Sequence, residues 1–368
     1  MIPLLQARVD PAAATMVAET LASGYINVRE RVAAFEHELA QYLGAGEVVC
    51  VNSCTSALVL ALRLAGCAGG NVITTPMTFV ATTTAIYQVG ARPLWADVGE
   101  LSCQIDALSV SDLLRRDHDR RVAAVVAVAW GGALPGLGAL ADVCRDYDRP
   151  LILDAAQAIG ASYQGRPLTE VADFVCYSFA PTKHLTCGDG GALICRSVGE
   201  TALARRMSWF GMRRWTEGSE RVPSDQQIPT WGYKFNMNEI AASIGLANLR
   251  SLPAALDRSR AIASRFEREF PLERRLRTGS TPWFFTLFVE DVTAFIEHAK
   301  ANGVAAGQPH RRNDTYAFAT ADCSSPRWLS NVEFAQAHYV AVPVGWWLSD
   351  ADVDRVVAMV RAFPGWVR

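Results

Sequence analysis

The sequence has almost no net charge and no strongly basic segment. Its 368 residues include 35 Lys plus Arg against 37 Asp plus Glu, which gives a formal net charge of −2. Proteins that bind nucleic acids through the phosphate backbone need clustered positive charge, so we expect no nucleic-acid partner. Half of the residues are hydrophobic. The chain therefore has enough apolar surface to fold, and its length predicts about two domains.

A convincing membrane segment is also absent. Residues 122–141 contain no charged side chain and are almost as long as the ~20 residues that cross a bilayer. However, four glycines and Pro135 in their second half would break a helix in lipid. The Val- and Ala-rich residues 122–130 predict instead a buried strand that leads into a loop. The first residues lack a basic region followed by an apolar run, so we expect no signal peptide, no membrane association and a cytoplasmic location.

Motifs for metals and for nicotinamide cofactors are missing as well. No cysteines have CxxC spacing and no histidines form an HxxxH pair, so we expect no metal site. No GxGxxG turn follows a strand, which argues against a nicotinamide-dependent oxidoreductase. The nine cysteines are odd in number and several lie in apolar runs, where a free thiol behaves as a small hydrophobic side chain. This usage predicts a reducing compartment.

From about residue 48 to 196, short β-rich runs alternate with helical patterns. Such alternation is typical of βαβ units and predicts an α/β fold with a mostly parallel sheet of about seven strands, sandwiched by helices. The predicted strands are 46–52, 71–75, 92–98, 122–130, 149–155, 173–179 and 191–195, and the clearest helical patterns are 56–66, 79–90 and 137–147.

After about residue 250 the pattern changes to a smaller α+β region. We therefore predict an N-terminal arm and large domain, residues 1–249, and a small C-terminal domain, residues 250–368. Residues 207–234 are rich in Trp and polar side chains and predict an irregular connection within the large domain. In the small domain we expect helices near 253–269, 292–302 and 349–363, and strands near 284–289 and 339–344.

Polar or reactive side chains follow three of the predicted strands, and ligands of open parallel sheets bind beyond the carboxyl ends of strands. Residues 52–57 start a helix with small hydroxyl side chains, which suits either ordinary capping or anion binding. Asp154 directly follows a buried strand, where it is either a helix cap or the partner of a cationic ligand atom. Lys183 lies between a strand and a glycine turn, where desolvation would lower its pKa and free the amine for Schiff-base chemistry.

Together these strand ends meet the requirements of a pyridoxal phosphate site: a phosphate cradle, a carboxylate that keeps the pyridine nitrogen protonated, and an amine that holds the aldehyde. With these residues in place, the sequence resembles the DegT/DnrJ/StrS-type sugar aminotransferases, a branch of the fold type I pyridoxal phosphate enzymes. The resemblance covers essentially the whole chain. Its motifs are Gly24-Tyr25-Ile26 with Phe35-Glu36, NSCTSAL (52–58), PMTFVAT (76–82), DAAQA (154–158), YSFAPTKHLTCGDGG (177–191), GYKFNMNEIAASIGLANL (232–249), HRRND (310–314) and PVGWWLSD (343–350).

The resemblance implies roles for individual residues. Lys183 would form the Schiff base and Asp154 would pair with the pyridine nitrogen. Gln157 would bond the ring hydroxyl, and Phe79 would stack on the ring. The residues that would hold the phosphate are Thr55, Ser56 and Ser178.

A second set of roles concerns a neighbouring subunit and the substrate. Asn236, and less clearly Lys234, would reach the phosphate of the neighbouring subunit's cofactor, so we expect a homodimer with shared active sites. The candidate substrate contacts are Tyr25, His310, Arg312 and Asn313.

The sequence departs from the family's pattern at three places. Cys54 stands where Gly is frequent, Arg29-Glu30 replaces a frequent Gly-Pro pair, and Ala129 replaces a His before the WGG turn. The last two lie in segments that border the substrate in the family. These departures make the substrates of the family a less reliable guide to the substrate of this protein, whereas they affect the expected cofactor chemistry less.

The implied activity is a two-stage transamination. An amino donor, glutamate or glutamine, would convert the cofactor to pyridoxamine phosphate, which would then aminate a keto-sugar. A nucleotide-linked keto-deoxysugar is the expected acceptor, for an amino sugar of a surface polysaccharide or an antibiotic; a keto-cyclitol stays open as the alternative. A pyridoxamine-phosphate-dependent sugar dehydratase fits less well, because those relatives carry His where this chain has Lys183. A non-catalytic protein of the same fold would have no need of Lys183 and Asp154.

Overall fold

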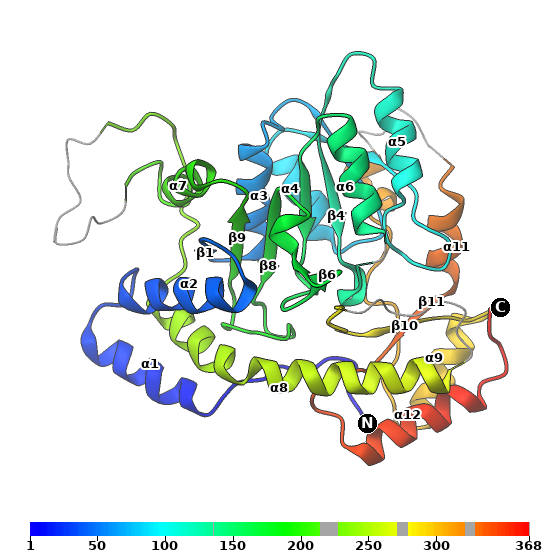
Figure 1. Ribbon diagram of the computed structural model, residues 1–368. Helices are drawn as coiled ribbons and strands as arrows, with labels where there is room; N and C mark the ends of the chain where they lie inside the picture. Colours follow the sequence, from blue (N-terminus) through cyan, green and yellow to red (C-terminus); the bar gives the residue numbers. More distant parts are fainter. Residues whose placement is uncertain (135, 214–226, 271–278, 321–327, 368) are drawn as a thin grey trace.

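A seven-stranded sheet with helices on both faces forms the centre of the protein (Figure 1). The strand order is β1-β9-β8-β5-β4-β2-β3; β9 is antiparallel to both of its neighbours, and the other six strands run in one direction. All seven predicted strands are present, so the predicted α/β fold is confirmed. They are β1 (Val49–Val51), β2 (Asn71–Thr74), β3 (Arg92–Trp95), β4 (Val122–Val128), β5 (Leu151–Asp154), β8 (Phe174–Ser178) and β9 (Gly191–Cys195). The computed structural model describes residues 1–134, 136–213, 227–270, 279–320 and 328–367.

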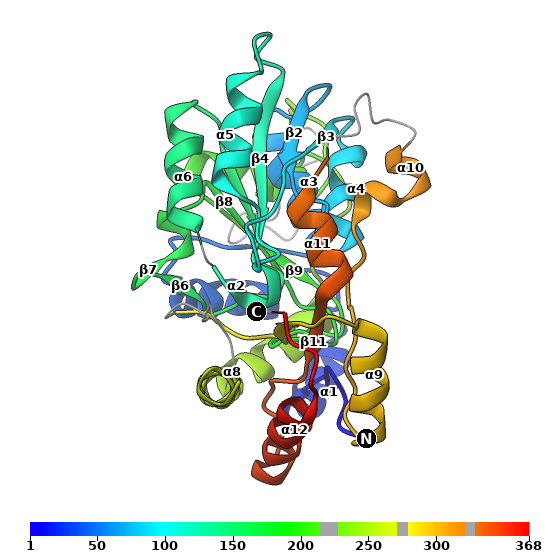
Figure 2. The same ribbon diagram turned by 90° about the vertical axis from the view of Figure 1, so that its right-hand side faces the viewer.

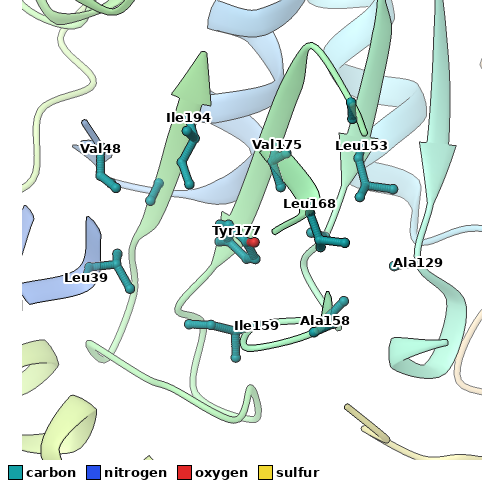
Figure 3. Packing of buried hydrophobic residues seen from close by; sticks show 14 of the residues in the cluster. Leu39, Val48, Ala129, Leu153, Ala158, Ile159, Leu168, Val175, Tyr177 and Ile194 are labelled. Atoms are coloured by element: carbon teal, nitrogen blue, oxygen red, sulfur yellow. The ribbon is translucent and has the colours of Figure 1, made fainter. Parts of the chain in front are cut away.

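Alternate residues of each strand pack on opposite faces of the sheet, as the two-residue period of a strand requires. Val175 and Tyr177 of β8 join one apolar core, and Cys176 between them joins the other. Figure 3 shows the first core, where Val175 lies near Leu153 and Ile194 of the flanking strands. Its covering helices are α2 (Glu30–Leu43), α5 (Ala107–Arg115), α6 (Leu137–Asp146) and α8 (Glu239–Glu269); the other face is covered by α3 (Cys54–Leu64), α4 (Val80–Gln88) and α7 (Val198–Met207).

The charge-poor stretch 122–141 is a strand, a turn and the start of a helix. β4 is buried along almost its whole length, because it lies in the middle of the sheet with helices on both faces. It ends before the turn Trp130–Gly132, and α6 follows. Among the residues that the structure describes, no helix combines the length and apolarity of a membrane span.

The C-terminal part of the chain forms a smaller unit with its own core. Two antiparallel strands, β10 (Phe285–Phe288) and β11 (Tyr339–Val342), pair at its centre (Figure 1), and Figure 2 shows β11 between the large sheet and α12. Both predicted strands of this region are found, and the helices predicted near 292–302 and 349–363 correspond to α9 (Val292–Ala301) and α12 (Asp350–Ala362). Two further helices, α10 (Ala317–Thr320) and α11 (Ser330–His338), were not predicted.

The long helix α8 corrects the prediction of a helix near 253–269. Pro253 suits the first turn of a helix, but here it lies inside one that begins at Glu239, where the Asn238 side chain accepts a hydrogen bond from the Ala241 N–H at 2.9 Å. The predicted domain boundary at residues 249 and 250 falls within this helix. Leu249 of α8 belongs to the first sheet core and Phe266 belongs to the C-terminal core, so both cores share it. The division into two domains stays a prediction.

The predicted irregular connection, residues 207–234, lies partly outside the described residues, which omit 214–226. On either side of that gap, Trp209 and Lys234 form an isolated antiparallel bridge. The remaining described residues of the connection after α7 are turns and irregular backbone, as expected. The N-terminal arm carries α1 (Ala12–Ser23), which packs along α8 (Figure 1).

Candidate active site

The carboxyl ends of β1 and β8 meet across a single glycine. Gly191 of the intervening strand β9 pairs with Val51 on one side and with Ser178 on the other. A Cβ atom on Gly191 would lie 2.5 Å from the backbone nitrogen of Cys54, so a glycine is required for this approach. As a result, Ser178 and the start of α3 lie on opposite sides of Gly191 and close to each other.

The start of α3 is arranged as a polar cradle. The Ser53 side chain accepts a hydrogen bond from the Ser56 N–H at 3.1 Å, and the Ser56 hydroxyl donates to Asn52 Oδ1 at 2.7 Å. The first N–H groups of a helix have no intrahelical acceptor, and the helix dipole adds partial positive charge there. Thr55 lies on the same turn and is half-buried. The cradle can therefore hold a small anion such as a phosphate group.

Asp154 ends β5 and is buried, with 5% of its surface exposed. Its Oδ2 accepts a hydrogen bond from the Thr82 hydroxyl at 2.7 Å, and its Oδ1 accepts one from the Ala156 N–H at 3.1 Å. The Cys54 thiol lies 4.0 Å from Oδ1. Burial raises the pKa of Asp154, and the bond from Thr82 opposes this rise. A buried carboxylate in this state is stabilised by a cationic partner.

Lys183 lies in the turn after β8, the strand next to β5. Burial lowers the pKa of its amine to about 8, while the charge of Asp154 acts in the opposite direction. Its Nζ lies over the indole of Trp283, 3.5 Å from the ring centroid. Because the pKa is close to neutrality, an appreciable fraction of the amine is uncharged and nucleophilic.

Gln157 is held between the Gly131 backbone and His310. Its Oε1 accepts a hydrogen bond from the Gly131 N–H at 2.7 Å, and its Nε2 lies 3.0 Å from His310 Nε2. Burial lowers the pKa of His310 to about 3, so the ring is neutral. An amide nitrogen only donates, so His310 Nε2 is the acceptor and the ring proton is on Nδ1. The turn Trp130–Gly132 therefore borders this site, as the strand-end position of Gly131 suggests.

Aromatic rings surround His310 on several sides. The ring of Trp130 lies 5.2 Å from the imidazole and that of Phe79 lies 5.7 Å away. Phe79 remains 56% exposed, which leaves most of its ring available to a ligand. His310 Nδ1 is buried and makes no hydrogen bond among the described residues.

The other predicted contact residues differ in their surroundings. Asn236 is buried; its Oδ1 accepts from Lys234 Nζ at 2.5 Å, and its Nδ2 donates to Asn27 Oδ1 at 3.2 Å. Tyr25 is exposed and carries the Arg29 guanidinium over its ring at 3.8 Å.

Arg312 and Asn313 are occupied by contacts within the chain. Arg312 donates two hydrogen bonds to Asp314, at 2.8 and 2.6 Å, and Asn313 is fully buried with its amide 2.8 Å from the Thr83 hydroxyl. We therefore leave both out of the proposed substrate contacts. Sequence reasoning assigned no role to Thr82 or Trp283; Thr82 lies in a motif that carried the resemblance, whereas no pattern singled out Trp283.

A mostly parallel sheet with a desolvated lysine and a buried carboxylate at adjacent strand ends defines an enzyme of the pyridoxal phosphate class. The chain belongs to the DegT/DnrJ/EryC1/StrS aminotransferase family, whose sequence profile matches residues 8–361. Enzymes of this family depend on pyridoxal phosphate, and the chain is a transaminase.

Three similar proteins illustrate the family. SpsC, a spore coat polysaccharide biosynthesis protein of Bacillus subtilis, is 34% identical over 278 residues, 75% of this chain and 68% of that protein. A dTDP-4-dehydro-2,3,6-trideoxy-D-glucose 4-aminotransferase of Saccharopolyspora spinosa is 30% identical over 68% of this chain and 66% of that enzyme. The crystal structure of the sugar aminotransferase CalS13 from Micromonospora echinospora is 31% identical, covers 99% of this chain and 100% of that one, and has a TM-score of 0.90. The chain is accordingly a sugar aminotransferase of amino-sugar biosynthesis.

Proposed function

We propose that the protein moves an amino group from glutamate or glutamine to a nucleotide-linked keto-deoxysugar. The observation that carries the proposal is the pairing of a desolvated Lys183 with a buried Asp154 at adjacent strand ends. The relative from Saccharopolyspora spinosa is named for a dTDP-linked keto-deoxysugar, which supports the class of acceptor. Glutamate or glutamine is the donor that the family resemblance implies.

The residues at the site fit pyridoxal phosphate. The start of α3, with Thr55 and Ser56, and the nearby Ser178 would hold its phosphate, since hydroxyl groups and free N–H groups suit an anion. Asp154 would pair with the ring nitrogen; its raised pKa reflects a buried carboxylate to which a cation would be a favourable neighbour. Phe79 would cover the ring with its exposed face. When bound, the cofactor supplies an aldehyde that takes up the amino group and a ring that withdraws electrons.

Lys183 is the proposed base and acid of the reaction. Its Nζ would bond the aldehyde at rest and, once displaced by the donor amine, would remove the proton from the donor's α-carbon. In the second stage it would return a proton to the sugar carbon that has received nitrogen. Acid–base help of this kind typically contributes about 10² to 10⁴-fold to the rate, and a pKa of about 8 suits both directions of transfer near neutral pH.

Gln157 is the proposed partner of the ring hydroxyl, and His310 would keep its amide in the correct orientation. The bond from the Gly131 N–H fixes Oε1, and the acceptor nitrogen of His310 fixes one hydrogen of Nε2. The second hydrogen of Nε2 stays available to a ligand oxygen. We thus assign His310 a positioning role, whereas the exposed Tyr25 remains a candidate substrate contact.

A cytoplasmic homodimer is the proposed functional unit, with Asn236 reaching the partner's cofactor phosphate. The test mixes Lys183→Ala and Asn236→Asp proteins, each of which should be inactive or weak alone. In a heterodimer of the two, one of the two active sites would combine the intact Lys183 of one subunit with the intact Asn236 of the other. We expect such mixing after mild dissociation to restore activity, measured against unmixed samples. Activity that merely averages the two variants would contradict shared sites.

The function itself is tested by an absorbance titration of the purified protein with bound cofactor. L-Glutamate or L-glutamine should bleach the visible band, and one keto-sugar nucleotide from a panel should restore it; keto-cyclitols in the same panel test the alternative acceptor. An L-alanine sample controls for unspecific bleaching. If no amino donor changes the spectrum, the proposed function is wrong.

A further inference from the structure

The indole of Trp283 is fixed against the amine of Lys183. Nζ lies 3.5 Å from the centroid of the ring. The indole Nε1–H donates to the Thr182 carbonyl at 2.8 Å, and the Trp283 backbone N–H donates to the Gly131 carbonyl at 2.9 Å. The ring also stacks on His310, with the centroids 6.1 Å apart and the planes at 21°. Because both its backbone and its side chain are held, the ring cannot turn away without breaking these contacts.

We propose that the face of Trp283 is the docking site of the protonated Lys183 amine whenever the lysine is not bonded to the cofactor. The face of an indole carries negative electrostatic potential and attracts an ammonium group, most strongly where water is excluded. Trp283 is 6% exposed, so the contact is of this desolvated kind. This proposal rests on the proposed role of Lys183 as a proton carrier. It adds Trp283 as the residue that contacts the lysine amine while that amine is protonated.

The chemistry of the docking site suits a group that must gain and lose a proton. A carboxylate in the same place would hold the ammonium strongly and could take its proton, whereas an indole face attracts the cation and accepts no proton from it. The groups that act on Lys183 from other elements are Asp154 on β5 and the Cys54 thiol on α3, which both favour the cation. The neutral His184 and His310 also lie within its electrostatic reach.

The test measures the protonation of Lys183 in the cofactor-free protein. The chain has three lysines, at 183, 234 and 300, so peptide mapping after labelling with a small neutral amine reagent over a pH series gives a titration midpoint for each. The exposed Lys300 serves as an internal reference. Replacement of the indole by fluorinated forms, Trp283→monofluorotryptophan and Trp283→tetrafluorotryptophan, keeps its shape and weakens the attraction of its face.

The midpoint of Lys183 should fall stepwise with fluorination, by up to about one pH unit for the tetrafluoro form, because a cation loses a favourable partner. The matched control is Trp130→tetrafluorotryptophan, since Trp130 is also buried and also packs on His310; it should leave the midpoint unchanged. An unchanged midpoint in the Trp283 forms, or an equal shift in the Trp130 form, overturns the proposal. The labelling uses neither cofactor nor substrate, so its outcome is separate from that of the absorbance titration with amino donors.

Discussion

The hydroxyl of Thr82 donates a hydrogen bond to Oδ2 of Asp154 at 2.7 Å. Thr82 is itself held by the hydroxyl of Thr78 at 2.8 Å, and both threonines are buried. The carboxylate that would pair with the cofactor's ring nitrogen is therefore oriented by the Thr82 hydroxyl of α4, which is held in turn by Thr78 just before that helix. A bond to an ionised group inside a protein is stronger than one between neutral groups.

Removal of this hydroxyl should weaken cofactor binding. In Thr82→Val the pKa of Asp154 should rise further, since the Thr82 bond lowers it. We expect the dissociation constant of pyridoxal phosphate to increase by about 10- to 100-fold, as for the loss of a hydrogen bond to a charged group, and Thr82→Ser to restore most of the affinity. Thr83→Val is the matched control, because that hydroxyl bonds Asn313 instead. Equal affinities of the Thr82→Val and Thr83→Val proteins would rule out this role.

Removal of the Lys183 amine should stop turnover without unfolding the chain. Lys183→Ala is expected to lower kcat by at least about 10²-fold, the smaller end of the usual contribution of acid–base catalysis, and to abolish the visible band of the bonded cofactor. Lys300→Ala removes an exposed lysine and should leave both unchanged. Steady-state kinetics and absorbance spectra provide the measurements, with circular dichroism as the check on folding. Near-normal turnover of Lys183→Ala would show that the catalytic amine lies elsewhere.

The two buried histidines should make the fold sensitive to acid. Burial lowers the pKa of His184 to about 4 and that of His310 to about 3, from an ordinary value of 6.5. At a pH between the lowered pKa of each histidine and its ordinary pKa of 6.5, the unfolded chain binds more protons than the folded one. The free energy of unfolding should therefore fall as the pH is lowered through this range. Each histidine contributes a slope of up to about 1.4 kcal/mol per pH unit.

Urea unfolding at a series of pH values below 6.5 measures this slope. His184→Gln keeps a donor for the Pro282 carbonyl, which His184 contacts at 2.9 Å, and should give a shallower slope. His118→Gln changes an exposed histidine and should leave the slope as in the natural chain. The same slope in all three proteins would refute the assignment to buried neutral histidines.

Gly191 should tolerate no side chain. In Gly191→Ala the new methyl group would lie 2.5 Å from the Cys54 nitrogen, so β9 and α3 must separate. We expect a loss of about 1–3 kcal/mol in the free energy of unfolding, as for other overpacked sites, and weaker phosphate binding. Gly199→Ala meets no atom within 4 Å and lies in α7, where alanine should be neutral or stabilising. Comparable urea midpoints for the two variants would argue against the close approach.

Patterns local to the chain explain why the central sheet could be predicted. Strands buried on both faces are continuous apolar runs, and β4 and β5 show this directly. The start of α8 was missed because Pro253 resembles a first-turn residue, whereas the Asn238 cap lies far upstream of it.

The candidate site could be predicted where its residues follow strand ends. Asp154 ends β5 and Lys183 lies in the turn after the adjacent strand β8, so topology alone brings them close. The contact of Lys183 with Trp283 joins segments 100 residues apart through the packing of the C-terminal unit, and no local pattern encodes it. Likewise, the pairing of Arg312 with Asp314 depends on side-chain conformation rather than on spacing.

Because α8 contributes residues to two cores, one continuous helix joins the two parts of the protein. Leu256 is the last of its residues in the first sheet core, and Ile262 is the first in the C-terminal core. Fewer than two helical turns separate Leu256 from Ile262, so the two cores are connected here by helix and not by a flexible linker. A rotation of the C-terminal unit relative to the large sheet would therefore have to bend α8 or break its packing against one of the two cores.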